Sequence, residues 1–326
     1  MGDDELEVLE VYGNDALARV FVARMRRGDP RSVVEFVESV QPPLSREEKW
    51  VIIVSSMFGC PIGCMMCDAG GSYAGPLTSQ EILAQIDECV IRRYPDHRVP
   101  SKKFKVQFSR MGEPSLNPAV LEALRALPDR FDAPGLIVSL STTAPARAHG
   151  FFEELLHIKQ EMYRNGRFQL QFSIHTTDLE KRRALIPAAT WTFEQIAEYG
   201  ERFFEPRHGD RKIVLNFAPL IDHPIDPSKL KEHFDPETFI VKLTPLNPTI
   251  RSMDQGMVSV LQHGRPETYK ELVKALDEKG YEVILSLGEE EENRIGSNCG
   301  QYVQRMLSEG RRPMDAYDVQ RYRGQI

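Results

Sequence analysis

The stretch of sequence that decides the fold reads Cys60-Pro61-Ile62-Gly63-Cys64-Met65-Met66-Cys67. Its cysteines have the spacing C-x3-C-x2-C, and they follow the apolar residues 51–54, which have the composition of a buried strand. Three thiolates can hold three irons of a [4Fe–4S] cluster and leave the fourth iron open for a small-molecule ligand. The stretch therefore predicts a cluster-binding loop directly after a buried strand.

Two other uses of these cysteines fit the sequence less well. A structural zinc site usually takes four ligands, commonly from two C-x2-C pairs, and the sequence has no second pair. A disulfide framework is untypical of a chain of 326 residues with five cysteines and an acidic start instead of a secretory signal. We therefore favour an iron–sulfur cluster, which also fits a reducing cytoplasm.

Composition narrows the class of protein. A hydrophobic content of 41% and a charged content of 27% are ordinary for a soluble globular protein. No apolar run approaches the roughly 20 residues that span a bilayer, so we expect a cytoplasmic protein that does not enter a membrane. The net charge of −7 argues against tight RNA binding, because sequence-independent phosphate binding depends on Lys and Arg.

Strands and helices alternate after the cysteines. We expect strands at residues 51–54, 104–109, 135–140, 168–175, 212–220, 239–246 and 281–287, with helices at 118–127, 151–164 and 266–279. This order predicts a parallel sheet with crossover helices. Before it, two short strands at 17–22 and 33–37 suggest a small N-terminal β element. We expect three parts: this element at 1–49, the α/β domain at 50–310 and a C-terminal tail at 311–326.

Polar residues follow several of the predicted strands at the point where each ends. Such segments are Arg110-Met111-Gly112-Glu113-Pro114, Ser141-Thr142-Thr143, Ser173-Ile174-His175 and Pro245-Leu246-Asn247-Pro248. Because the carboxyl ends of parallel strands meet at one edge of an α/β barrel, we expect chemistry there. A glycine allows close backbone approach, and the carboxylate of Glu113 can bind an ammonium group.

Together with the cysteine loop, this order resembles the radical S-adenosylmethionine (SAM) enzymes and, among them, the RlmN/Cfr-type methyltransferases of large-subunit rRNA. The resemblance runs from about residue 33 to residue 303, and its most specific segment is Asn298-Cys299-Gly300-Gln301. It implies a partial (β/α)6 radical SAM barrel with a [4Fe–4S] cluster on Cys60, Cys64 and Cys67. It also implies contacts to SAM from Gly112, Glu113, Ser141, Ser173, Ile174, His175 and Asn247.

The resemblance further implies that Cys299 carries a methyl group taken from one SAM. A second SAM then supplies the radical that abstracts hydrogen from this methyl group, and the resulting carbon radical adds to an sp2 carbon. In the family a glutamate at the position of Glu35 is the proton acceptor. The alternatives are a buried or incidental cysteine at 299 and an exposed glutamate on a short strand at 35. Cys89 shares a helical face with Ile82 and Ile86, so we expect it in the core.

The chain departs from the family at two places. The rRNA enzymes carry a second catalytic cysteine seven residues before the first cluster cysteine, where this chain has Ile53. We also expect no counterpart of their added N-terminal helical domain, because only about 30 residues precede Glu35. We therefore expect a small-molecule biosynthetic substrate in preference to rRNA, and an electron donor such as flavodoxin or ferredoxin.

Three other functions stay open. The chain could be an rRNA or tRNA adenine methyltransferase with a changed resolving residue. It could be a radical SAM enzyme that abstracts hydrogen without a methylated cysteine. It could also be an iron–sulfur or zinc protein that uses the barrel only as a binding module.

Overall fold

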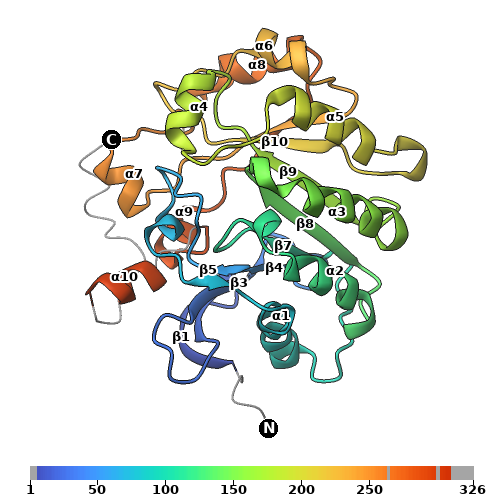
Figure 1. Cartoon of the computed structure of the whole chain (residues 1–326), viewed down its shortest axis with the longest axis vertical. Helices are drawn as coiled ribbons and strands as arrows, with labels where there is room; N and C mark the ends of the chain where they lie inside the picture. Colours follow the sequence, from blue (N-terminus) through green and yellow to red (C-terminus); the bar gives the residue numbers. More distant parts are fainter. Residues whose placement is uncertain (1–5, 263–264, 299–301, 310–326) are drawn as a thin grey trace.

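The structure, a computed structural model, describes residues 6–262, 265–298 and 302–309. It contains a ten-stranded sheet in which spatial order follows chain order (Figure 1). The strands are β1 (Glu7–Gly13), β2 (Ala18–Arg24), β3 (Val33–Val40), β4 (Trp50–Val54), β7 (Phe104–Phe108), β8 (Leu136–Thr142), β9 (Phe168–Ser173), β10 (Ile213–Phe217), β11 (Phe239–Leu243) and β12 (Val283–Leu285). A separate two-stranded sheet pairs β5 (Met57–Phe58) with β6 (Gly75–Pro76).

The seven strands from β4 to β12 in this sheet are parallel to their neighbours. The partial α/β barrel expected from the sequence is thereby confirmed. Five of these strands end earlier than expected, at Phe108, Ser173, Phe217, Leu243 and Leu285. At β9 the reason is visible: His175 has φ 65°, a left-handed conformation that cannot continue a strand.

Helices follow the parallel strands. They are α1 (Ser79–Arg93), α2 (Ala119–Arg130), α3 (His149–Met162), α4 (Leu179–Leu185), α5 (Phe193–Phe203), α6 (Pro227–His233), α7 (Ile250–Asp254), α8 (Lys270–Glu278), α9 (Glu290–Ile295) and α10 (Tyr302–Glu309). Thr78 and Glu81 form a capping box at the start of α1, satisfying backbone donors that the helix leaves free. Cys89 on α1 is fully buried beside Ile82 and Ile86, so its assignment to the core is confirmed.

The N-terminal region differs from the expectation of two short strands, because β1 adds a third. Its residues are only partly buried at the sheet edge, so its sequence lacks a strong apolar pattern. β1, β2 and β3 pair antiparallel, and β3 also pairs antiparallel with β4. These strands therefore extend the barrel sheet itself.

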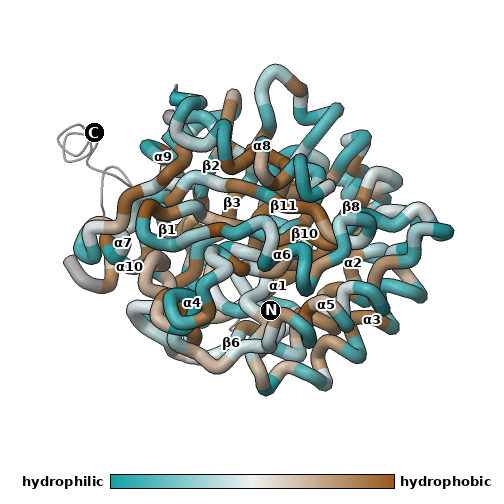
Figure 2. Tube along the Cα trace, turned by 90° about the horizontal axis from the view of Figure 1, so that it is seen from above, coloured by the Kyte–Doolittle hydropathy of each residue, from teal (hydrophilic) through white to brown (hydrophobic). Residues whose placement is uncertain are grey.

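Apolar residues concentrate along the central strands and the sides of the helices that face them, while the outer loops are hydrophilic (Figure 2). On β4 and β7, fully buried residues alternate with half-buried ones. The half-buried positions of β7 are Lys105 and Gln107, and β11 contributes Lys242. Barrel interiors of this kind are usually filled by Val, Ile and Leu. The polar interior here is the first structural sign of a binding site.

Candidate active site

The three cysteines lie on a tight loop after β5. Gly59, which precedes them, has φ 73°, and a Cβ there would lie 1.5 Å from the carbonyl oxygen of Ser72. Glycine is therefore required at this position, because any side chain would collide with the returning chain. The Cys67 N–H donates to the Cys64 carbonyl at 3.1 Å, and the short 3-10 helix Asp68–Gly71 follows.

The cysteine loop is anchored at the carboxyl end of the barrel by segments far away in the sequence. The Met65 N–H donates to the carbonyl of Leu185 at the end of α4 (2.9 Å), and the Thr249 hydroxyl donates to the carbonyl of Met66 (2.7 Å). The Asp68 carboxylate accepts the first two N–H groups of α7, both at 3.0 Å. The loop is thus attached directly to the segment that carries Asn247, one of the predicted SAM contacts.

The thiols of the loop share a poorly solvated environment. Burial raises the pKa of Cys60 to about 12 and also raises the pKa of Cys64 and Cys67. The neighbouring cysteines and Glu113 add to the rise in pKa at Cys60 and Cys64. Thiolates in such surroundings need a compensating cation, as an iron–sulfur cluster provides. The donor set therefore fits a cluster.

Within the residues that the structure describes, no group of three or more His, Cys, Asp or Glu side chains is arranged to hold a metal ion. A single ion draws all its ligands to one centre, as tetrahedral zinc does. A [4Fe–4S] cluster instead spreads its three cysteines over three irons. The assignment of a cluster to the three thiols stays a prediction.

Glu113 lies in the loop that follows β7, with its carboxylate buried. One oxygen accepts the hydroxyls of Thr142 (2.5 Å) and Ser115 (2.7 Å). The other accepts the N–H and the hydroxyl of Thr143, at 2.8 and 2.9 Å. Glu113 therefore ties the loop after β7 to the end of β8. A contact to the ammonium group of SAM would come in addition to these bonds.

The neighbouring predicted contacts lie at the same edge of the sheet. Gly112 has φ 99°, and a Cβ there would lie 2.6 Å from Cβ of Met57, so it allows the close approach expected of it. Ser141 and Ser173 are half-buried near the carboxyl ends of β8 and β9. Ile174 is fully buried, and its N–H donates to the carbonyl of Asn216 (2.9 Å).

His175 is held by its backbone and its ring. Its Nδ1 accepts the N–H of Ala218 at 3.1 Å, which fixes the tautomer with the proton on Nε2. Burial lowers the pKa of His175 to about 3, with Arg182 and His223 adding to the effect. The imidazole is therefore neutral at physiological pH. It can bind a ligand by hydrogen bonding from Nε2 but cannot act as a cation.

Glu35 on β3 is completely buried, so the alternative of an exposed glutamate at this position is wrong. Its carboxylate pairs with Arg110 (Nη2–Oε2, 2.6 Å) and accepts the N–H of Val303 at 2.8 Å. Arg110 in turn donates to the carbonyls of Gly296 and Ser297, both at 2.7 Å. Cys299 itself lies outside the described residues. The pair nevertheless binds the chain on both sides of it. Whether Glu35 accepts a proton stays a prediction.

Sequence reasoning missed two residues of this site. Arg182 on α4 reaches Ser173 through a long contact to its carbonyl (3.5 Å) and lies close enough to Cys64 to interact electrostatically. Its Nε is buried without a hydrogen-bond partner in the described residues, and burial lowers its pKa to about 10. Asp68 anchors the cysteine loop. Its position directly after Cys67 was the available signal, whereas no spacing in the sequence marks Arg182.

Known proteins resemble the chain in both sequence and structure. It is 28% identical over 257 residues to "Probable dual-specificity RNA methyltransferase RlmN" of Prochlorococcus marinus, covering 77% of this chain and 67% of that protein. It is 33% identical over 224 residues to the protein of the same name from Thermosynechococcus vestitus, covering 66% and 60%. The chain thus spans three-fifths to two-thirds of these relatives. No family model matches it.

Among solved structures, the fold is similar to a radical SAM methyltransferase from Sphaerobacter thermophilus. The TM-score is 0.65 at 17% identity, over 86% of this chain and 77% of that one. This likeness shows the fold. No helix among the described residues has the length and apolar character needed to cross a membrane.

Proposed function

Because this chain is related to the RlmN/Cfr-type radical SAM methyltransferases, we propose that it transfers a methyl or methylene group to an sp2 carbon through Cys299. Enzymes of this kind use a [4Fe–4S] cluster and SAM, and we assign the cluster to Cys60, Cys64 and Cys67. When bound, the cluster supplies the electron that cleaves SAM.

One observation carries the proposal. The cysteine loop is fastened by Asp68 and Met66 to the segment from Asn247 to Arg251, and the charge of the Glu113 carboxylate raises the pKa of Cys60 and Cys64. Segments separated by some 180 residues in the chain therefore meet at the carboxyl end of the barrel. The residues expected to bind the cluster and those expected to bind SAM share one place.

The chain's own residues have distinct tasks there. We assign Arg182 to an anionic group of the bound cofactor, because its Nε has no described partner and a guanidinium binds carboxylates in a bidentate manner. His175 stays neutral and donates from Nε2. The Cys299 thiolate is the nucleophile that accepts a methyl group from a sulfonium. Its thioether then provides the carbon that is transferred.

We propose a small molecule as the acceptor. The interior of the barrel contains a partly open cavity of about 560 Å³, which is the size of a site for one small ligand. Asn298, the residue before Cys299, lines this cavity. The second candidate is an RNA adenine, favoured by the names of the relatives. RNA binding would show the steep salt dependence of phosphate contacts.

The proposal is tested with anaerobically reconstituted enzyme, SAM and dithionite. We expect 5′-deoxyadenosine to form with the unmodified chain, to be lost in Cys64→Ala, and to persist in the matched control Cys89→Ala. Cluster formation without any SAM cleavage would contradict the proposal and favour a binding module. Cleavage without methylation of Cys299 would favour simple hydrogen abstraction.

A further inference from the structure

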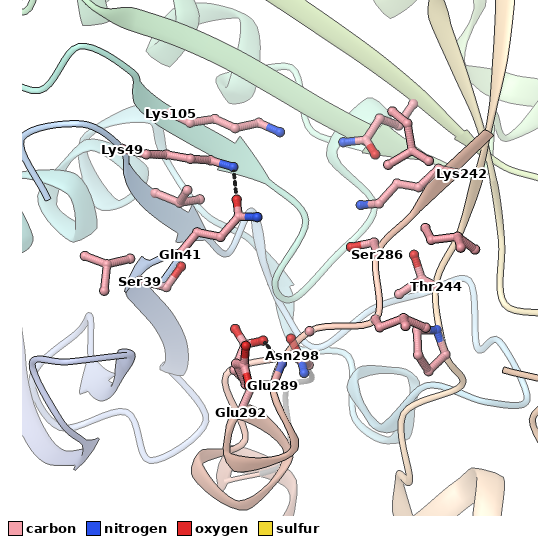
Figure 3. Close-up of a pocket in the computed structure, with 18 of the residues that line it drawn as sticks. Ser39, Gln41, Lys49, Lys105, Lys242, Thr244, Ser286, Glu289, Glu292 and Asn298 are labelled. Atoms are coloured by element: carbon pink, nitrogen blue, oxygen red, sulfur yellow. Dashed lines mark hydrogen bonds between the residues drawn. The ribbon is translucent and has the colours of Figure 1, made fainter. Parts of the chain in front are cut away.

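The cavity inside the barrel has lysines on facing walls. Lys49 and Lys105 extend into it from the side of β4 and β7, and Lys242 extends toward them from β11 (Figure 3). Arg211, just before β10, also lines it. Four cations thus line one pocket of about 560 Å³ in a chain whose net charge is −7.

Few groups on the protein neutralise these cations. Within the described residues, Lys105 and Lys242 make neither a hydrogen bond nor an ion pair, and Lys49 bonds only the amide of Gln41. The carboxylates among the lining residues are Glu289 and Glu292, which lie on a separate wall at the start of α9 (Figure 3). The Glu292 carboxylate accepts the Glu289 N–H at 3.0 Å.

The arrangement is unfavourable without a ligand. Burial lowers the pKa of Lys105 to about 7, and Lys242, Lys49 and Arg211 add to the effect. Burial also lowers the pKa of Lys242 and of Lys49. Like charges gathered in a partly dry interior cost free energy, whereas aliphatic residues at the same positions would stabilise the barrel. An anion in the cavity would remove this cost.

The remaining lining residues complete a site of mixed character. Gln169 and Gln171 on β9, Thr244 after β11 and Ser286 after β12 offer hydrogen bonds. Apolar side chains lie among them, contributed by Val51, Val214, Ile284, Leu285 and Leu287. Asn298 also lines this cavity. A ligand with an anionic group and a planar apolar body would match this wall.

We propose that the acceptor of this site is a small unsaturated molecule carrying a phosphate or carboxylate group, which Lys105 and Lys242 bind. The inference rests on the proposed function, since it names the substrate class of the same site. The lysines fix the anionic end, and the sp2 carbon lies toward the wall that carries Asn298.

Phenyl phosphate and benzoate serve as probes, with phenol as the neutral analogue. Binding to the reconstituted holoenzyme is measured by calorimetry with SAM present, so that the SAM site is filled. We expect one of the two anions to bind at least about tenfold more tightly than phenol, because charge-assisted bonds are the strong ones. Phosphate and carboxylate are distinguished by which probe binds more tightly.

Lys105→Met and Lys242→Met should each lower the affinity for the anion about tenfold or more and leave the affinity for phenol unchanged. Lys274→Met, at an exposed lysine on α8 next to Glu278, is the matched control and should change neither. In the unmodified enzyme, the affinity for the anion should fall between pH 7 and pH 9 as Lys105 loses its proton. Lys105→Met should reduce that fall, which a purely structural lysine would not influence.

Equal affinities for the anions and phenol, or unchanged affinity in both lysine variants, would overturn the inference. The inference would also be overturned if an adenine-containing RNA hairpin bound more than tenfold more tightly than either anion and lost affinity to the same extent in the lysine variants. SAM cleavage is assayed in the same preparations. Its absence would count against the proposed function alone, whereas cleavage without selective anion binding would count against the substrate class alone.

Discussion

The buried pair of Glu35 and Arg110 gives the sharpest prediction on stability. The side chains are 0% and 2% exposed, and the two residues bind the chain at 296, 297 and 303. Removing one partner leaves the other charge buried without compensation, which costs about 3–5 kcal/mol. We expect this loss for Arg110→Met, measured as the free energy of unfolding by denaturant titration. Arg202→Gln, at a pair with Glu153 that is 46% and 52% exposed, is the control and should cost about 0–1 kcal/mol.

Glu35→Gln removes the charge but keeps an oxygen that can accept the Val303 N–H. We expect the double variant Glu35→Gln/Arg110→Met to be less destabilised than the sum of its parts, with a coupling of about 0.5–3 kcal/mol. Arg110→Met should also reduce alkyl transfer more than SAM cleavage, because it releases the chain beside Cys299. Additive losses, or alkyl transfer that stays in proportion to cleavage, would refute the positioning role. Loss of transfer in Glu35→Gln at full stability would instead support a proton acceptor.

The other predictions concern the cluster, the SAM site and pH. Cys60→Ala, Cys64→Ala and Cys67→Ala should each lose the visible absorbance of the cluster and all SAM cleavage, and an intact cluster in any of them would reject that ligand. Glu113→Ala should weaken SAM binding at least about tenfold, because it removes a carboxylate and the hydrogen bonds that hold Thr142 and Thr143. An unchanged dissociation constant for SAM would exclude a contact between Glu113 and SAM. In the folded protein the pKa of Lys105 is about 7, below the ordinary value of 10.5. Between pH 7 and pH 10.5 the folded protein therefore binds fewer protons than the unfolded chain, so the free energy of unfolding should rise with pH in this range. Lys105→Met should reduce that rise, and an identical pH profile would contradict the burial of the charge.

Features of the fold could be predicted from the sequence where they depend on a local sequence pattern. The parallel strands and the cysteine loop were predictable because apolar runs and C-x3-C-x2-C spacing are local patterns. Strand β1 was not predicted, because its residues are only partly buried and form no clear apolar pattern. Its place at the sheet edge comes from pairing with β2, which an isolated apolar pattern does not encode.

The site was predictable only in part for a similar reason. Two arginines of the site interact with residues that are distant in sequence. Arg182 interacts electrostatically with Cys64, and Arg110 forms an ion pair with Glu35. A charged residue in a loop or on a short helix normally faces solvent, so nothing local marks it as buried. Lys105 on β7, Lys242 on β11 and Lys49 directly before β4 come together only after the sheet has curved. Their convergence therefore comes from the tertiary structure alone.

The central claim is that Cys299 carries the group that is transferred. The most direct measurement is peptide mass spectrometry of enzyme incubated anaerobically with SAM bearing a deuterated methyl group. The account predicts a labelled methyl group on Cys299 and none on Cys89, which is buried in the core. An unmodified Cys299 in enzyme that cleaves SAM would contradict the account.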